Sequence, residues 1–189
     1  MDAAATFHRR ATTDPQPLFL FEARHDRIHQ LGSTLAKDFG WTVFRAEGVY
    51  TRGRKFEVLR VSDPDGVVPQ NTLDAIVGAD FNLPGDFRFN LQLFQRVLFN
   101  HDPDVILKRR ESGYSVYLTR ELTSQLEAQF LYISSLERSD WMLRPKLIWK
   151  FEKNWRLTGG VDLFHGPPLG FFGRFANRDR IYSELRYSF

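Results

Sequence analysis

Apolar and polar residues alternate along most of the chain, in segments of about ten residues that recur from residue 28 to the end. Between Thr72 and Leu83 every odd position is apolar, whereas the even positions include Asp74 and Asp80. A period of two places alternate side chains on opposite faces of a β-strand. The pattern predicts about nine strands, at 28–38, 44–51, 73–83, 87–99, 114–122, 126–132, 141–151, 155–163 and 180–189.

The connections between these predicted strands alternate in length. Longer connections cover 52–71, 100–112 and 166–177, and the short ones lie near Gly40, Pro84, Thr123 and Lys153. Outer-membrane barrels have short periplasmic turns and longer external loops, and only the connection at 137–140 is shorter than this rule predicts. Aromatic residues lie next to the short turns, as expected at a membrane interface: Phe39, Trp41, Phe81, Phe87, Phe151 and Trp155.

A soluble sandwich or small barrel also alternates and also uses Gly/Pro turns. Nine strands with full apolar faces, however, leave few residues in loops to cover those faces. The preferred interpretation is therefore an all-β, antiparallel, up-and-down transmembrane β-barrel. Pro145 lacks a ladder donor, so we expect a local irregularity in its strand.

The last predicted strand alternates up to a terminal phenylalanine. Ile181, Leu185, Tyr187 and Phe189 share one face of this strand. The pattern resembles the C-terminal β-signal of outer-membrane proteins, the segment that the barrel-assembly machinery recognises. These four residues are the candidate assembly signal.

A second resemblance runs through most of the chain. It is carried by the stretches at 47–53, 94–97, 154–157, 164–175, 179–180 and 187–189. These stretches resemble the C-terminal part of large proteobacterial outer-membrane barrels that form a domain family of unknown function. The resemblance implies an outer-membrane location and a larger barrel, and it implies no catalytic or binding residues.

The domain organisation follows from the strand count and the N-terminal sequence. Residues 1–19 contain no apolar core typical of a secretory signal, and single-chain bacterial barrels have an even number of strands. We therefore expect a C-terminal fragment, with 1–27 as an external segment and 28–189 as transmembrane strands. Its expected partners are outer-membrane lipid, the assembly machinery and the N-terminal remainder of the parent barrel.

Composition narrows the function classes. The chain is 42% hydrophobic, has no apolar run near the roughly 20 residues of a membrane helix, and contains no cysteine, which excludes disulfides and thiolate metal sites. The net charge is +3, but 26 basic residues are interleaved with 23 acidic ones. We expect no nucleic-acid partner.

Catalytic and metal-binding motifs are absent from the sequence. There is no glycine-rich phosphate loop, no HExxH and no GxSxG. His25 and His29 have a spacing that could hold a metal on a helix, but they fall in an extended segment, and nothing orders Ser139 and Asp140 with a distant histidine. We expect no enzyme, no cofactor and no metal.

The face opposite the apolar one carries charges of both signs. They form either a water-filled wall with a slight anionic preference or an ion-pair lattice that braces a plugged lumen. The leading interpretation is a channel or uptake pore for small solutes; the alternatives are a structural or partner-anchoring barrel without transport and a soluble all-β binding domain. The candidate lumen-facing residues are Arg45, Glu47, Asp74, Asp80, Arg88, Arg96, Glu121, Glu127, Arg144, Lys146, Lys150, Arg156, Asp162, Arg180, Glu184 and Arg186.

Overall fold

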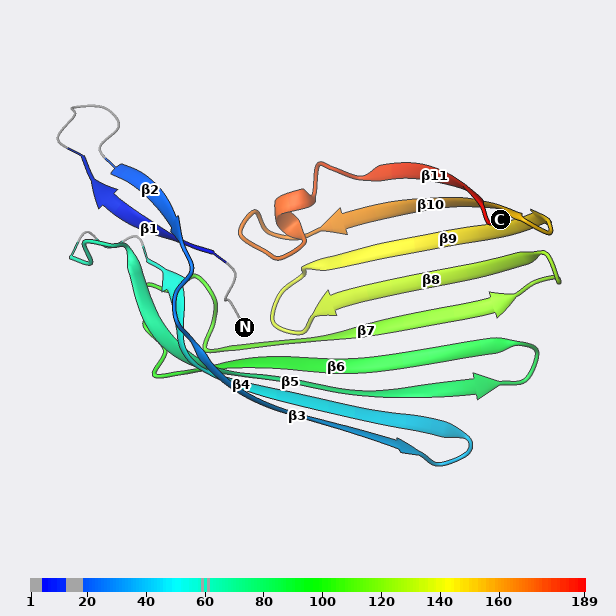
Figure 1. The fold of residues 1–189 in the computed structure, drawn as a ribbon, viewed down its shortest axis with the longest axis horizontal. Helices are drawn as coiled ribbons and strands as arrows, with labels where there is room; N and C mark the ends of the chain where they lie inside the picture. The colour runs from blue at the N-terminus through cyan, green and yellow to red at the C-terminus, as the bar shows by residue number, and fades with distance from the viewer. Residues whose placement is uncertain (1–4, 13–18, 59, 61) are drawn as a thin grey trace. The chain divides into compact units, whose positions relative to one another are not determined.

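The computed structural model describes residues 5–12, 19–58, 60 and 62–189. Two strands, β1 (Thr6–Ala11) and β2 (Phe19–Arg24), pair as an antiparallel hairpin. Nine further strands form a second sheet in chain order (Figure 1): β3 (His29–Asp38), β4 (Thr42–Glu57), β5 (Val67–Leu83), β6 (Phe87–Phe99), β7 (Arg110–Glu121), β8 (Leu126–Ser135), β9 (Trp141–Glu152), β10 (Trp155–His165) and β11 (Arg180–Tyr187).

This sheet confirms the predicted antiparallel up-and-down architecture with nine strands. It is not closed, because β3 and β11 form its two edges. Direction alternates from strand to strand, so β3 and β11 run the same way. Among the described residues, no helix is long and apolar enough to cross a membrane.

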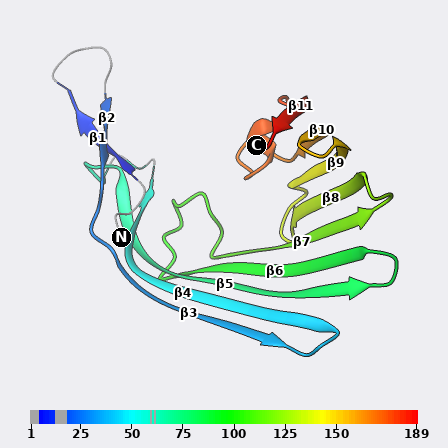
Figure 2. The ribbon, with the colours of Figure 1, turned by 45° about the vertical axis from the view of Figure 1, so that its right-hand side comes forward.

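The described residues group into two compact units. Unit 1 comprises the described parts of 1–33, 47–75 and 95–111, and unit 2 comprises 34–46, 76–94 and 112–189. The hairpin of β1 and β2 lies in unit 1. Strands β7 to β11 lie almost wholly in unit 2, side by side in chain order (Figures 1 and 2).

The predicted long connection at 52–71 is wrong in its extent. Strand β4 continues to Glu57 and β5 begins at Val67, so the connection covers 58–66 only. The charged stretch after Thr51 hides the alternation, and Gly53 interrupts it with a positive φ of 80°. Val67 and Val68 are buried instead of lying in a solvated loop, and β-branched residues favour the extended conformation.

The short turns of unit 2 are built from residues that tolerate positive φ. Gly40 has a φ of 85°, and its N–H donates to the Asp38 carboxylate at 2.7 Å. Gly85 and Asp86 close the β5–β6 turn with φ values of 78° and 56°. Gly and Asp are suited to these conformations, so the sequence itself specifies the predicted turns.

The register in unit 2 separates an apolar face from a polar one. Directly paired residues point to the same face, and Leu147 pairs with Ala128 on β8 and with Gly159 on β10. The adjacent residue Lys146 pairs with Gln129 and Gly160 on the opposite face. We call these the apolar face and the polar face.

The register of β9 against β10 is the same on both sides of Pro145. Lys146 pairs with Gly160 and Leu143 with Leu163. The register shift lies instead between Trp155 and Leu157, beside the hairpin turn. Between the pairs of Lys146 and Leu143, neither Pro145 nor Arg144 has a paired residue on β10, which the structure describes throughout, so the local irregularity expected at Pro145 is a gap in the ladder without a change of register.

Burial on the two faces of unit 2 is the reverse of that in a soluble sheet. Leu147 and Trp149, on the apolar face of an interior strand, are 52% and 47% exposed, whereas Ile148 between them is 9% exposed. On the polar face Asp162 is fully buried. The polar face thus contains buried side chains of this unit, such as Asp162 and Ile148, whereas Leu147 and Trp149 on the apolar face are left uncovered.

Candidate functional site

A charged cluster joins the last three strands on the polar face of unit 2. The buried carboxylate of Asp162 on β10 accepts hydrogen bonds from Arg144 Nε on β9 and from Arg180 Nε on β11, at 2.5 Å and 2.6 Å. Asp162 and Arg180 are directly paired across the strands. Three of the predicted wall residues thus form one network, in which two guanidinium groups compensate one buried charge.

Two further groups of polar residues lie on β4–β6 and on β8–β9. Arg45 and Asp80 form an ion pair, and the Asn90 amide donates to the same carboxylate at 2.6 Å. Glu127 accepts a hydrogen bond from Gln129 at 2.5 Å and lies 4.0 Å from Lys150 Nζ. These contacts place the residues on one face.

The polar residues of unit 1 repeat this arrangement. Asp74 on β5 forms an ion pair with Arg96 on β6, and Arg54 Nη1 on β4 lies 3.7 Å from the same carboxylate. Arg54 was not among the predicted wall residues, because it falls in the stretch assigned to a loop. Strand β4 in fact continues to Glu57 and includes Arg54. The period of two that starts at Arg45 does not predict the face of Arg54, because Gly53 interrupts the strand between them.

The remaining wall residues divide into two kinds. Glu184 pairs with Arg186 on its own strand, Nη2 to Oε1 2.8 Å, at an exposed position. Five wall residues form no ion pair within the described part of the chain: Glu47, Arg88, Glu121, Lys146 and Arg156. The predicted wall is therefore an ion-pair network with a few free charges.

A hollow of about 430 Å³ opens on the polar face of unit 2. Most of its lining residues are polar in type, and they come from β4 to β8: Val43, Arg45, Asp80, Phe81, Asn82, Arg88, Phe89, Asn90, Tyr117, Thr119, Glu127 and Gln129. Four of the predicted wall residues, Arg45, Asp80, Arg88 and Glu127, are thus grouped around one cavity. Its neutral hydrogen-bonding residues were not singled out by the sequence, because uncharged polar residues also fill ordinary solvent-facing positions.

The candidate assembly signal pairs with β10 on the apolar face. Ile181 lies opposite Val161, Leu185 opposite Leu157 and Tyr187 opposite Trp155. The Tyr187 and Trp155 rings are 4.9 Å apart between centroids. Phe189 differs: the strand ends at Tyr187, and the Phe189 side chain is fully exposed.

Aromatic pairs mark the short-turn ends of unit 2. Trp41, Phe81 and Phe89 contact one another in a row, with centroid distances of 5.8 Å and 5.7 Å. Phe151 and Trp155 stack at 6.4 Å beside the β9–β10 turn. The predicted clustering of aromatics near the short turns is observed as ring contacts across strands.

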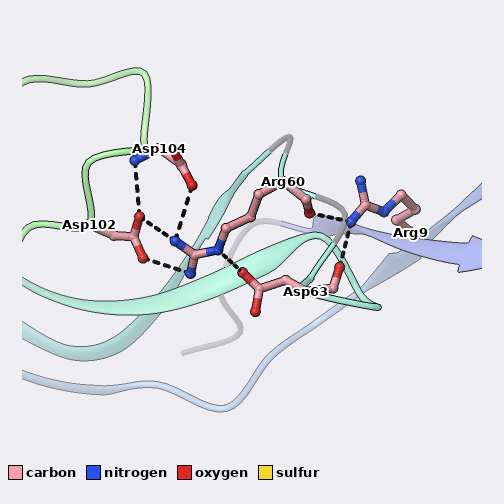
Figure 3. Close-up of polar contacts among 5 residues, drawn as sticks. All are labelled: Arg9, Arg60, Asp63, Asp102 and Asp104. Carbon is pink, nitrogen blue, oxygen red and sulfur yellow. Dashed lines mark hydrogen bonds and ion pairs between the residues drawn. The ribbon is translucent and has the colours of Figure 1, made fainter.

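An arginine in unit 1 joins two connections (Figure 3). Arg60, from the β4–β5 connection, binds Asp63 beside it and Asp102 and Asp104 of the β6–β7 connection; its Nη2 lies 2.8 Å from Asp102 Oδ2. Arg9 of β1 donates to the Arg60 carbonyl oxygen at 2.7 Å. We call this set the Arg60 lock.

Hydrogen bonding shifts the pKa values of two groups in the lock. The Asp104 backbone N–H and the Arg60 guanidinium lower the pKa of Asp102. Hydrogen bonds from Arg60 to Asp102 and Asp63 raise the pKa of the guanidinium. The sequence did not reveal this set, because its acidic and basic members lie far apart in the chain and none is part of a recognisable motif.

The β10–β11 connection is held by the buried carboxylate of Asp140. This group accepts hydrogen bonds from the backbone N–H groups of Phe171, Phe172 and Gly173, at 2.6, 2.9 and 2.9 Å. A Cβ on Gly173 would come within 2.0 Å of the Pro167 carbonyl oxygen, so glycine is required there. Asp140 therefore fixes the backbone conformation of the β10–β11 connection.

No protein-family model, curated protein or solved structure matches the chain. Within the described ranges, no three His, Cys, Asp or Glu side chains are grouped so as to hold a metal ion. The features of unit 2 that bear on function are its apolar face and its polar face.

Proposed function

We propose that the chain forms part of the wall of a β-barrel in the bacterial outer membrane, and that its polar face lines a path for small solutes. The observation that carries this proposal is the reversed burial in unit 2. An apolar face with Leu147 and Trp149 about half exposed costs free energy in water but not against acyl chains. The buried Asp162 network fits the interior of such a wall.

The strand lengths of unit 2 fit the same environment. Strands β7, β8, β9 and β10 have 12, 10, 12 and 11 residues. A tilted strand of about 9–11 residues crosses the hydrocarbon core of a bilayer. The aromatic contacts near the short turns would then lie at one membrane interface.

The two open edges need partners in this environment, since unpaired backbone groups in lipid cost several kcal/mol each. Strands β3 and β11 run in the same direction, so an antiparallel closure needs an odd number of further strands between them. If a second copy with the same membrane orientation closed the sheet, its β3 would pair with β11 of the first copy in parallel, which does not continue the antiparallel order. We therefore propose the remainder of a larger barrel as the partner, inserted by the assembly machinery that reads the pattern ending at Phe189.

Conduction is supported by water-accessible charges around the hollow. The Arg45 side chain is largely exposed although it pairs with Asp80, and Arg88 forms no ion pair within the described ranges. Charges of both signs at one wall fit a wet path with weak selectivity.

A second candidate function, anchoring a partner outside the membrane, is favoured by β4 and β5. These strands have 16 and 17 residues, more than the about 9–11 residues that a tilted crossing requires. Their ends carry the Arg60 lock. A pre-ordered surface of this kind suits binding of a partner.

Planar-bilayer recording of the full-length protein tests the proposal. We expect extraction from membranes only with detergent, followed by stepwise conductance after reconstitution. Release into buffer without detergent would contradict the membrane location. Detergent dependence without conductance would reject the channel and leave the anchoring function.

A further inference from the structure

The hollow is lined by two arginines and two carboxylates, of which only Arg45 and Asp80 pair with each other. Arg45 is neutralised by Asp80, and Glu127 is engaged by Gln129 and faces Lys150. Arg88 lines the same hollow and has no ion-pair partner in the described part of the chain. After these pairings, one guanidinium remains available inside the cavity.

The strand register extends this positive region along the polar face. Thr119 pairs directly with Gln129, and Gln129 pairs directly with Lys146. Lys146 also has no ion-pair partner among the residues that the structure describes. A row of neutral hydrogen-bonding side chains therefore runs from the hollow toward a second free cation, with no carboxylate in the row.

The next row toward the short turns has the opposite character. Glu121 and Glu127 are directly paired there. Glu127 is largely buried and already holds Gln129, so it is poorly placed to accept a mobile cation. Glu121 forms no ion pair among the described residues, but it does not line the hollow. The unpaired charge within the lining is therefore the Arg88 guanidinium, which suits an anion.

The geometry points to a binding subsite for a small oxyanion, a carboxylate or phosphate group, held by the Arg88 guanidinium with the Tyr117 and Thr119 hydroxyls as neutral donors. This inference rests on the proposed function, because solute reaches the polar face only if that face lines a wet path. The planar fork of an arginine matches two oxyanion oxygens. A volume of about 430 Å³ falls within the range of small-ligand sites, roughly 300–1,000 Å³.

Isothermal titration of the detergent-solubilised full-length protein with inorganic phosphate, and separately with acetate, tests the subsite and distinguishes the two sources of oxyanion. We expect saturable binding of at least one probe. Arg88→Ala should weaken it about tenfold or more, the loss expected for a charge-assisted hydrogen-bond pair. Arg88→Lys should retain part of the affinity, because it keeps the charge without the fork. Any variant is compared only after it shows the wild-type circular-dichroism spectrum.

The matched control is Arg156→Ala, which removes an equally unpaired cation of the polar face that does not line the hollow. It should leave the affinity unchanged. Absence of binding to wild-type protein, unchanged binding in both Arg88 variants, or equal losses in Arg88→Ala and Arg156→Ala would overturn the subsite. Binding without bilayer conductance supports the subsite and rejects the channel. Conductance without binding supports the channel and rejects the subsite.

Discussion

Arg144 on β9 and Asp162 on β10 form a two-point ion pair, with Nε to Oδ1 at 2.5 Å and Nη2 to Oδ2 at 3.2 Å. The carboxylate is fully shielded from solvent, whereas the arginine side chain is about one-third exposed. On the opposite face of β9, the Leu147 side chain is half exposed. The strongest polar contacts of unit 2 thus lie on its packed side, and its apolar side chains lie outside.

Replacing Asp162 should destabilise the sheet more than replacing an exposed acid. Asp162→Asn leaves the guanidinium groups of Arg144 and Arg180 without their acceptor charge, and we expect a loss of about 1–3 kcal/mol in unfolding free energy. The control Glu184→Gln breaks an exposed pair and should cost about 1 kcal/mol at most. Urea titration in lipid vesicles measures both. Equal losses would argue against a buried carboxylate.

A positive charge on the apolar face should be costly in lipid. Leu147→Arg should reduce the free energy of unfolding by about 2–4 kcal/mol, the penalty for arginine at the bilayer midplane. Its neighbour on the polar face provides the control, and Lys146→Leu should cost less than about 1 kcal/mol. The same vesicle titration measures both variants. A near-neutral Leu147→Arg would indicate that this side chain meets water.

The strands of unit 2 were predictable from sequence, because alternation and turn chemistry are local properties. The β7–β8 hairpin is an example: the predicted strands 114–122 and 126–132 correspond to Arg110–Glu121 and Leu126–Ser135. The extension of β4 past Thr51 was missed because Gly53 breaks the period of two. The hairpin of β1 and β2 was missed because its residues were interpreted as an external segment.

The polar contacts were predictable only in part. Charges of both signs at even positions indicated a common face, but which residues pair depends on the register between strands. Asp162 shows the difference: the sequence places it on the polar face, and only the register brings it between Arg144 and Arg180. The Arg60 lock joins residues more than 40 positions apart, which no local pattern reveals.

The Arg60 lock should open in acid. Asp102 has a lowered pKa in the folded protein, so its contribution is present above the ordinary carboxyl value near 4 and is lost as the pH falls through the lowered value. Arg60 stays charged throughout. Protection of the described amides at 62–66 and 100–109 against hydrogen exchange, relative to their intrinsic rates at each pH, should therefore be high at neutral pH and fall below about pH 4.

The variant Arg60→Ala should show this loss of protection already at neutral pH, with strands β7 to β10 unaffected. Arg110→Ala, at the start of β7, serves as a control of equal charge. If exchange in the two connections is the same in Arg60→Ala and wild type, the lock does not hold them together.

Deleting Phe189 should affect assembly more than stability. The side chain is fully exposed and follows the end of β11, so its loss should change the unfolding free energy by less than about 0.5 kcal/mol. The level of the variant protein in the outer membrane of living cells should nevertheless fall, if the assembly machinery recognises the terminal pattern during insertion. Tyr187→Ala is the comparison, because it also removes the ring contact with Trp155 and should lower stability. Unchanged membrane levels without Phe189 would reject the assembly signal.

Whether the apolar face of unit 2 contacts lipid is tested most directly by two single-cysteine variants, Leu147→Cys and Lys146→Cys. The chain contains no other cysteine, so each thiol can carry one nitroxide label. In membranes containing the full-length protein, with any cysteine outside these 189 residues replaced by serine, we measure collision of each label with oxygen, which concentrates in lipid, and with a water-soluble nickel complex. The account predicts that the label at 147 collides mainly with oxygen and the label at 146 mainly with the nickel complex. Preferential collision of the label at 147 with the nickel complex would contradict it.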